Sequence, residues 1–147
     1  MDRRTRICLW IILVGLGNFL AYSVLYWLIG GEAVNGRVEQ WPGQVRYFLQ
    51  TGREAPRAVF FYSGVHSISI WPTVAAILLA MLTLAKDRIV SSMHSGVVRG
   101  RAMVTILAVV IALTAALMTF VFIHQFTGHL NHPQAWDAAA RAVRLAP

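Results

Sequence analysis

Residues 102–123 read AMVTILAVVIALTAALMTFVFI, a run of 22 residues without a single Asp, Glu, Lys or Arg. Residues 7–29 and 58–85 form two more uncharged runs, of 23 and 28 residues. A helix needs roughly 20 mostly apolar residues to cross a hydrocarbon core of about 30 Å. The run nearest the N-terminus, residues 7–29, exceeds the roughly 7–15 apolar residues of a signal peptide, so we expect it to remain uncleaved. The sequence therefore predicts an all-α integral membrane protein with three transmembrane helices.

The composition supports this fold class. Of the 147 residues, 57% are hydrophobic and 13% are charged, against roughly 45–50% and 25% in soluble domains. The net charge of +7 comes from small groups of basic residues beside the uncharged runs. Because these groups do not form one face, we expect the lipid bilayer, and no nucleic acid, as the partner. Cys8 is the only cysteine, which rules out an internal disulfide.

The distribution of Lys and Arg predicts how the chain crosses the membrane. The N-terminus and the second loop are densest in basic residues, whereas the first loop offsets its arginines with Glu32, Glu39 and Glu54. Short basic segments stay on the cytoplasmic side. We therefore predict one domain, residues 1–147, in a bacterial inner (cytoplasmic) membrane, with the N-terminus inside and the C-terminus outside. The expected boundaries are spans at about 7–29, 62–85 and 102–125, an outer loop at 30–57, an inner loop at 86–101 and an outer tail at 126–147.

The outer loop contains apolar residues at helical spacing. Pro42 suits the first turn of a helix and Gly52 suits a C-terminal cap. We predict a short helix lying on the membrane surface, and the alternative is an irregular loop with scattered aromatic residues. The spaced apolar residues are Trp41, Val45, Phe48 and Leu49.

The outer tail predicts a second interfacial helix. The Asn131-His132-Pro133 sequence resembles a helix start, and Trp136, Ala140 and Val143 then recur on one face. The alternative for this alanine-rich segment is a frayed tail.

Small and polar residues recur along the spans at helical spacing. Small residues let helix backbones approach in lipid, where apolar side chains give no preference for protein over lipid tails. The pattern predicts that the second and third spans pack as an antiparallel pair and that the first span closes a three-helix bundle. The predicted packing residues are Gly17, Asn18 and Ala21 in the first span, Ser69, Thr73, Ala76 and Ala80 in the second, and Ala108, Ala112 and Ala115 in the third.

Asn18 lies near the middle of the first span. An amide exposed to hydrocarbon is costly, so we expect its side chain to bind a polar group on another helix. This contact would fix the packing of the helices, and contact with a substrate is the alternative.

The histidines are candidate ligands. His66 facing His124 across two helices has the chemistry of a b-type haem site, and His124, His129 and His132 suggest a zinc or copper site. Joint ligation by His124 and His129 would require the helix to end near Thr127-Gly128. A proton-handling role is a further alternative. We favour the structural alternative, in which the histidines pack and hydrogen-bond, and so we predict no cofactor.

Residues 58–69, AVFFYSGVHSIS, resemble a segment of small bacterial inner-membrane proteins in which an aromatic-Ser segment precedes a His and another Ser. The resemblance covers the first two spans and the loop between them. It implies a membrane location and directs attention to Tyr62, His66 and Ser69, but it implies no activity. This chain has Trp71-Pro72 where such proteins carry a His-Pro pair.

These observations favour a structural or accessory membrane subunit, in a homo-oligomer or a larger membrane complex. No catalytic motif is present in the sequence, so no enzyme activity is predicted. The alternatives are an electron-transfer subunit that uses the outer histidines and an oligomeric transporter or channel component. Small residues exposed on a second face of a span would favour the accessory subunit.

Overall fold

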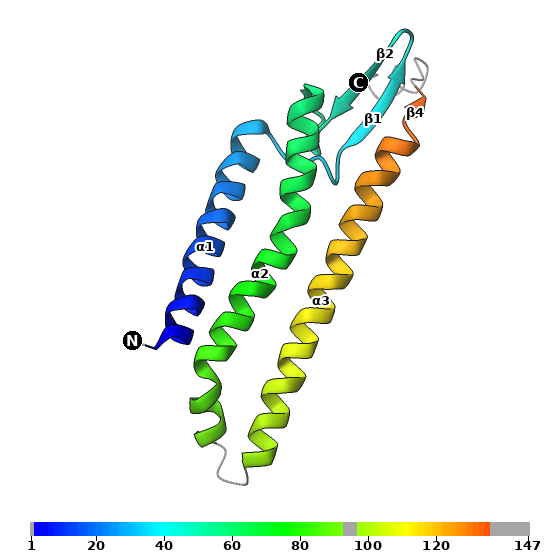
Figure 1. Cartoon of the computed structure of the whole chain (residues 1–147). Coiled ribbons are helices and arrows are strands. Elements are labelled where there is room, and N and C mark those ends of the chain that lie inside the picture. Colours follow the sequence, from blue (N-terminus) through cyan, green and yellow to red (C-terminus); the bar gives the residue numbers. More distant parts are fainter. Residues whose placement is uncertain (1, 93–96, 136–147) are drawn as a thin grey trace, which may run out of the picture.

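The computed structural model of the chain describes residues 2–92 and 97–135. Three helices run side by side and short strands gather at one end (Figure 1). The elements are α1 (Arg3–Ile29), β1 (Arg37–Trp41), β2 (Gln44–Phe48), β3 (Glu54–Ala55), α2 (Arg57–Ser92), α3 (Val97–Asn131) and β4 (Gln134–Ala135).

The prediction of three long apolar helices is confirmed, because all three helices are long and apolar enough to cross a membrane. The fold is not all-α, because a small sheet accompanies the helices. The helices have 27, 36 and 35 residues, so α2 and α3 are about 54 and 52 Å long at 1.5 Å per residue. Since a hydrocarbon core measures about 30 Å, α2 and α3 extend well beyond it.

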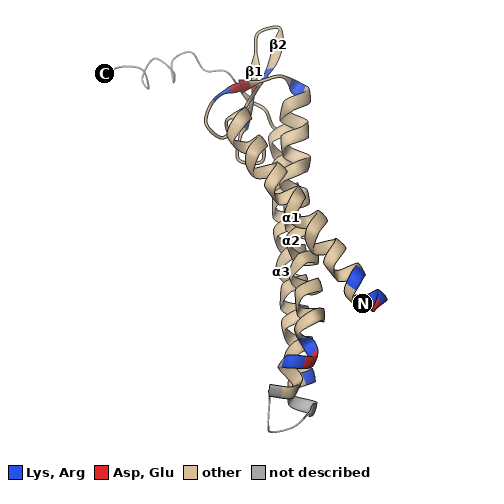
Figure 2. Ribbon diagram, turned by 90° about the vertical axis from the view of Figure 1, so that its left-hand side faces the viewer, with Lys and Arg blue, Asp and Glu red and all other residues tan. Residues whose placement is uncertain are grey.

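The helices form an open row with α2 in the middle. In Figure 1, α1 and α3 lie on opposite sides of α2. In the view turned by 90°, the helices overlap and α1 tilts away toward its N-terminus (Figure 2). Because α1 and α3 make few direct contacts, the predicted closed bundle is wrong.

The α1–α2 contact uses a glycine and a polar pair. A Cβ on Gly15 would lie 2.6 Å from Cγ1 of Ile77, so only glycine allows this approach. The Asn18 amide, which was expected to need a polar partner, donates to the Thr73 hydroxyl at 3.3 Å. Gly17 takes no part in this contact, because a Cβ there would meet nothing within 4 Å.

The α2–α3 contact is aromatic. The Phe60 and Phe126 rings stack with their centroids 5.8 Å apart. The Trp71 and Phe122 rings meet edge to face, with 5.6 Å between their centroids. The Phe126 ring also lies directly over Gly64. In the half of α2 nearer the sheet, the face toward α3 is therefore built from large rings around a glycine.

The predicted small-residue stripes do not pair with each other. Thr73 contacts α1, and Ala76 lines a groove together with α1 residues. Ala108 and Ala112 line an open groove beside α2. α2 and α3 do pack against each other, as predicted, but not through matched stripes. Thr73 in the α2 stripe contacts α1, whereas the α2–α3 contact nearer the sheet uses aromatic residues. The remaining packing candidates are half-buried at Ser69 and Ala115 and buried at Ala80.

The predicted surface helix in the first loop is wrong, because this loop forms a β-hairpin. β1 pairs antiparallel with β2, and Trp41 opposite Gln44 leaves Pro42 and Gly43 as the turn. Gly43 has φ +80°, which suits the third position of a tight turn. The hairpin pairs its own backbone groups and is thus neither a helix nor an irregular loop.

The sheet has the strand order β3-β2-β1-β4. β4 pairs in parallel with β1, which ties the chain after α3 to the hairpin. The core under the sheet is formed by Ala33, Val34, Val38, Leu49, Ala55, Phe60 and Phe126.

The end of α3 differs from the expected outer tail. α3 continues to Asn131 and is followed by β4 at Gln134–Ala135, so no helix begins at Asn131-His132-Pro133. The rest of the predicted tail helix, including Trp136, lies outside the described residues.

Replacing Gly64 by Ala tests the aromatic α2–α3 contact. The added methyl group would overlap the buried Phe126 ring, so we expect the free energy of unfolding, measured by SDS titration in mixed micelles, to fall by about 1–3 kcal/mol. Gly128→Ala in α3 is the control, because a Cβ there meets nothing within 4 Å. Equal effects of the two substitutions would contradict the contact.

Candidate functional site

The chain reverses sharply after α1. Gly30 and Gly31 have φ of +84° and +114°, a region that favours glycine. Both N–H groups donate to the carbonyl of Tyr26, at 3.2 and 2.9 Å, and the Arg53 guanidinium donates to two further α1 carbonyls at 3.4 Å. A cation is favoured at this end of a helix. The reversal places Glu32 against the helix that the chain has just left.

Glu32 has a buried carboxylate, with 8% of the residue exposed. The Tyr22 hydroxyl donates to its Oε2 at 2.7 Å, and the Asn35 amide donates to its Oε1. No ion pair within residues 2–92 and 97–135 includes Glu32. Because a buried carboxylate is costly without hydrogen bonds, these neutral donors are what stabilise it here.

α2 contributes polar side chains to the same place. The Ser63 hydroxyl accepts a hydrogen bond from the Ala33 backbone N–H at 3.1 Å. Nδ1 of His66 lies 3.1 Å from the Tyr62 hydroxyl, and its ring meets the Tyr22 ring edge to face at 5.4 Å. The site thus joins α1, α2 and the segment after α1.

Two buried polar atoms at this site have no hydrogen-bond partner in the described part of the chain. They are Nε2 of His66 and Oγ of Ser67. Such atoms are uncommon because each costs free energy. We call this site the junction cluster, and it consists of Tyr22, Glu32, Asn35, Ser63, His66 and Ser67.

The open space within the junction cluster is small. A cavity of about 10 Å³ lies among Tyr22, Tyr62, Ser63 and His66. This volume is near the minimum for one water molecule, so it leaves no room for a haem or another organic cofactor. Phenol, carboxylate and imidazole groups in contact can hold or pass a proton, and that is the chemistry this arrangement offers.

Glu32 was not predicted to be a member of this site. Its position in the first loop suggested only a loop charge, since the uncharged runs contain no acidic residue. The Gly30-Gly31 pair was the available signal, since two adjacent glycines permit the reversal that returns Glu32 to α1.

The structure does not bring the proposed haem ligands together. His66 contacts Tyr22 and Tyr62 on the α1 side of α2. His124 is exposed on α3 and stacks on Phe120, with 6.3 Å between the ring centroids. Within the described residues, no contact joins the two histidines.

The proposed metal ligands are only partly brought together. α3 is continuous past Thr127-Gly128, so His124 and His129 remain about 140° apart around the helix. His129 and His132 share a pocket of about 190 Å³ with Arg37, whose positive charge opposes a metal cation. In the part of the chain that the structure describes, no group of three or more His, Cys, Asp or Glu could hold a metal ion.

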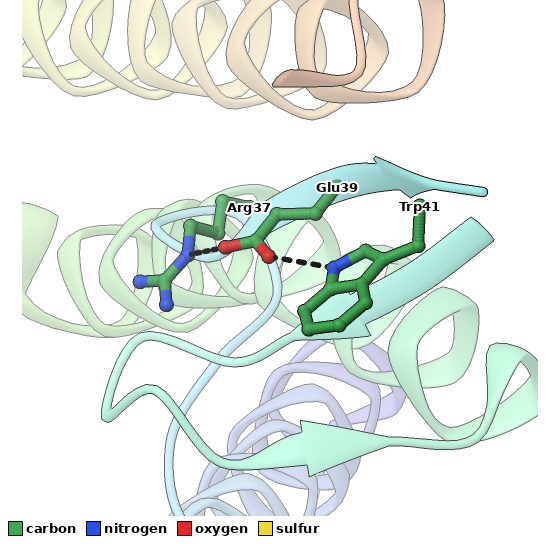
Figure 3. Close-up of polar contacts among 3 residues, drawn as sticks. All are labelled: Arg37, Glu39 and Trp41. Atoms are coloured by element: carbon green, nitrogen blue, oxygen red, sulfur yellow. Dashed lines mark hydrogen bonds and ion pairs between the residues drawn. The ribbon is translucent and has the colours of Figure 1, made fainter. Parts of the chain in front are cut away.

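A second buried carboxylate lies on β1. Glu39 accepts hydrogen bonds from Nε of Arg37 at 2.7 Å and from Nε1 of Trp41 at 2.9 Å (Figure 3). All three side chains share one face because alternate residues of a strand point the same way. The Arg46 guanidinium lies 4.3 Å from the Trp41 ring centroid. Contacts among arginine, carboxylate and indole groups thus stabilise this face of the hairpin.

Comparisons of the chain with protein-family models, curated proteins and solved structures gave no significant match.

Replacing Glu32 by Ala tests whether its carboxylate holds the chain on α1. The substitution leaves the Tyr22 hydroxyl and the Asn35 amide without an acceptor, so we expect the free energy of unfolding by SDS titration to fall by about 2 kcal/mol.

Two further variants sharpen this test. Glu32→Gln keeps one acceptor oxygen and should lose less than Glu32→Ala. Glu54→Ala removes an exposed ion pair with Arg46 and should lose less than about 1 kcal/mol. Equal losses for Glu32→Ala and Glu54→Ala would show that the buried contacts of Glu32 contribute little.

Proposed function

We propose that the chain is an accessory membrane subunit that packs in the bilayer against a transmembrane helix of another subunit. That subunit is a second copy of this chain or part of a larger membrane complex. The proposal includes the bacterial inner membrane, with the N-terminus inside. The three apolar helices support residence in a membrane, and the open faces of the row support a lateral partner.

The single observation that carries the proposal is the position of Gly17 and Ala21. A Cβ on Gly17 would meet nothing within 4 Å, and Ala21 is exposed. Two residues along a helix rotate it by about 200°, so Gly17 lies nearly opposite Gly15, which packs against α2. Gly17 and Ala21 therefore form a small-xxx-small pair on a face of α1 that the chain itself leaves uncovered.

Such a pair favours a helix over lipid as its neighbour. Lipid tails can cover a helix face whether its side chains are large or small. A second helix, by contrast, gains close backbone contact only where the side chains are small. A separate open groove of about 380 Å³ lies between α1 and α2, with Trp10, Ile11, Val14, Gly15, Thr73 and Ala76 as its lining.

The junction cluster has a supporting role in this proposal. Its cavity of about 10 Å³ is closed to an organic substrate, and its hydrogen bonds hold the segment after α1 to the helices. These hydrogen bonds fix the sheet relative to the helices, which is favourable for a subunit whose role is to bind another protein.

Replacing Gly17 by Leu tests the proposed function. A Cβ at this position meets nothing within 4 Å, and a leucine side chain there blocks close approach of another helix. We expect the mass of the complex purified in mild detergent, measured by light scattering, to fall from that of an assembly to that of a single chain.

Ala116→Leu is the control, since it adds similar volume on an exposed position of α3. It should leave the mass of the assembly unchanged. A wild-type chain that is monomeric and carries no other subunit, or an assembly that tolerates Gly17→Leu, would overturn the proposal.

A further inference from the structure

A groove lies between α2 and α3 at the end of the row opposite the sheet. It measures about 550 Å³, and its apolar lining includes Leu79, Val104, Ala108 and Ala112. The two alanines leave space where larger side chains would have filled the contact between the helices. The groove is therefore a consequence of the sequence of α3.

Close helix contacts flank the groove along the pair. Toward the sheet, Trp71 and Phe122 meet with ring centroids 5.6 Å apart. Toward the opposite end, the backbones nearly touch, because a Cβ on Gly100 would lie 3.0 Å from Cα of Val90. α2 and α3 are thus in close contact on both sides of the groove along their length, and the groove itself is open to the surface.

Two cations lie at one end of the groove. Lys86 and Arg101 both line it, and neither belongs to an ion pair among the residues that the structure describes. Asp87 follows Lys86 in sequence, but it lies about 100° away around the helix and does not line the groove. Figure 2 shows basic residues in blue at this end of α2 and α3.

The cations lie at the depth of lipid headgroups. Lys86 directly follows the uncharged run 58–85, and Arg101 directly precedes the run 102–123. From Arg101 to Ala112 the helix rises about 16 Å at 1.5 Å per residue, close to half of a hydrocarbon core of about 30 Å. The groove thus extends from the headgroup region to about the middle of the bilayer.

We propose that this groove binds one anionic phospholipid. Lys86 and Arg101 bind the phosphate, and an acyl chain lies along Val104, Ala108 and Ala112. Basic pockets between transmembrane helices suit such headgroups, and the length of the apolar lining matches one leaflet. This site is separate from the Gly17 face and does not depend on the proposed function.

Native mass spectrometry of the full chain in detergent tests the site. Dioleoyl-phosphatidylglycerol and dioleoyl-phosphatidylcholine serve as probes with identical acyl chains and different charge. We expect one phosphatidylglycerol to bind about 25-fold more tightly than phosphatidylcholine, because each of two basic residues near the headgroup contributes about fivefold.

Matched variants separate the headgroup from the acyl chain. Lys86→Gln combined with Arg101→Gln should abolish the preference for phosphatidylglycerol, whereas Arg88→Gln, outside the groove, should keep it. Ala112→Leu fills the groove at an exposed position and should weaken binding of both lipids, whereas Ala116→Leu should not.

Three results would overturn the proposal. They are equal binding of the two lipids to the wild-type chain, a preference that survives the double substitution, and Ala112→Leu binding as tightly as Ala116→Leu. Inorganic phosphate distinguishes a lipid from a free anion as the ligand. Displacement of phosphatidylglycerol by millimolar phosphate would assign the site to the free anion and also overturn the proposal.

Discussion

The aromatic stack around Phe60 is the interaction on which the sheet and the helices both depend. Phe60 is fully buried in α2, and its ring lies 5.8 Å from that of Phe126 in α3 and 5.2 Å from that of Tyr47 in β2. Aromatic pairs contribute about 0.5–1.5 kcal/mol each beyond the area they bury. One side chain thus connects two spans and the hairpin, which makes the sheet an extension of the helical row.

The position of this stack is compatible with helices that cross a bilayer. An open sheet edge cannot lie in hydrocarbon, because its unpaired N–H and C=O groups would have no partner. α2 begins at Arg57, and α3 continues to Asn131, eight residues beyond the uncharged run that ends at Ile123. These extensions place the sheet beyond the uncharged runs, where β4 pairs with β1 and Glu32 is held by hydrogen bonds.

The spans could be predicted from the sequence, whereas the contacts between them could not. Hydropathy adds up residue by residue, so each uncharged run identifies its own helix. The hairpin was missed because the residues from Trp41 to Leu49 also fit a helical spacing, and Pro42-Gly43 was assigned to a helix start instead of a turn. Glu32 was missed because its role depends on Tyr22, ten residues earlier, and on a chain reversal that no local pattern records.

Small residues show why packing in a membrane is hard to derive from a pattern. Gly15 and Gly64 admit a neighbouring side chain of the same molecule, Gly17 faces outward, and Ala108 and Ala112 leave a hollow. The same lack of side-chain volume therefore gives an internal contact, an uncovered face or a groove. The outcome depends on the residue of the neighbouring helix that faces the small one. Where a large ring such as Phe126 fills the space, the two helices pack closely. Where the opposite residue is not large enough to fill it, the space stays open.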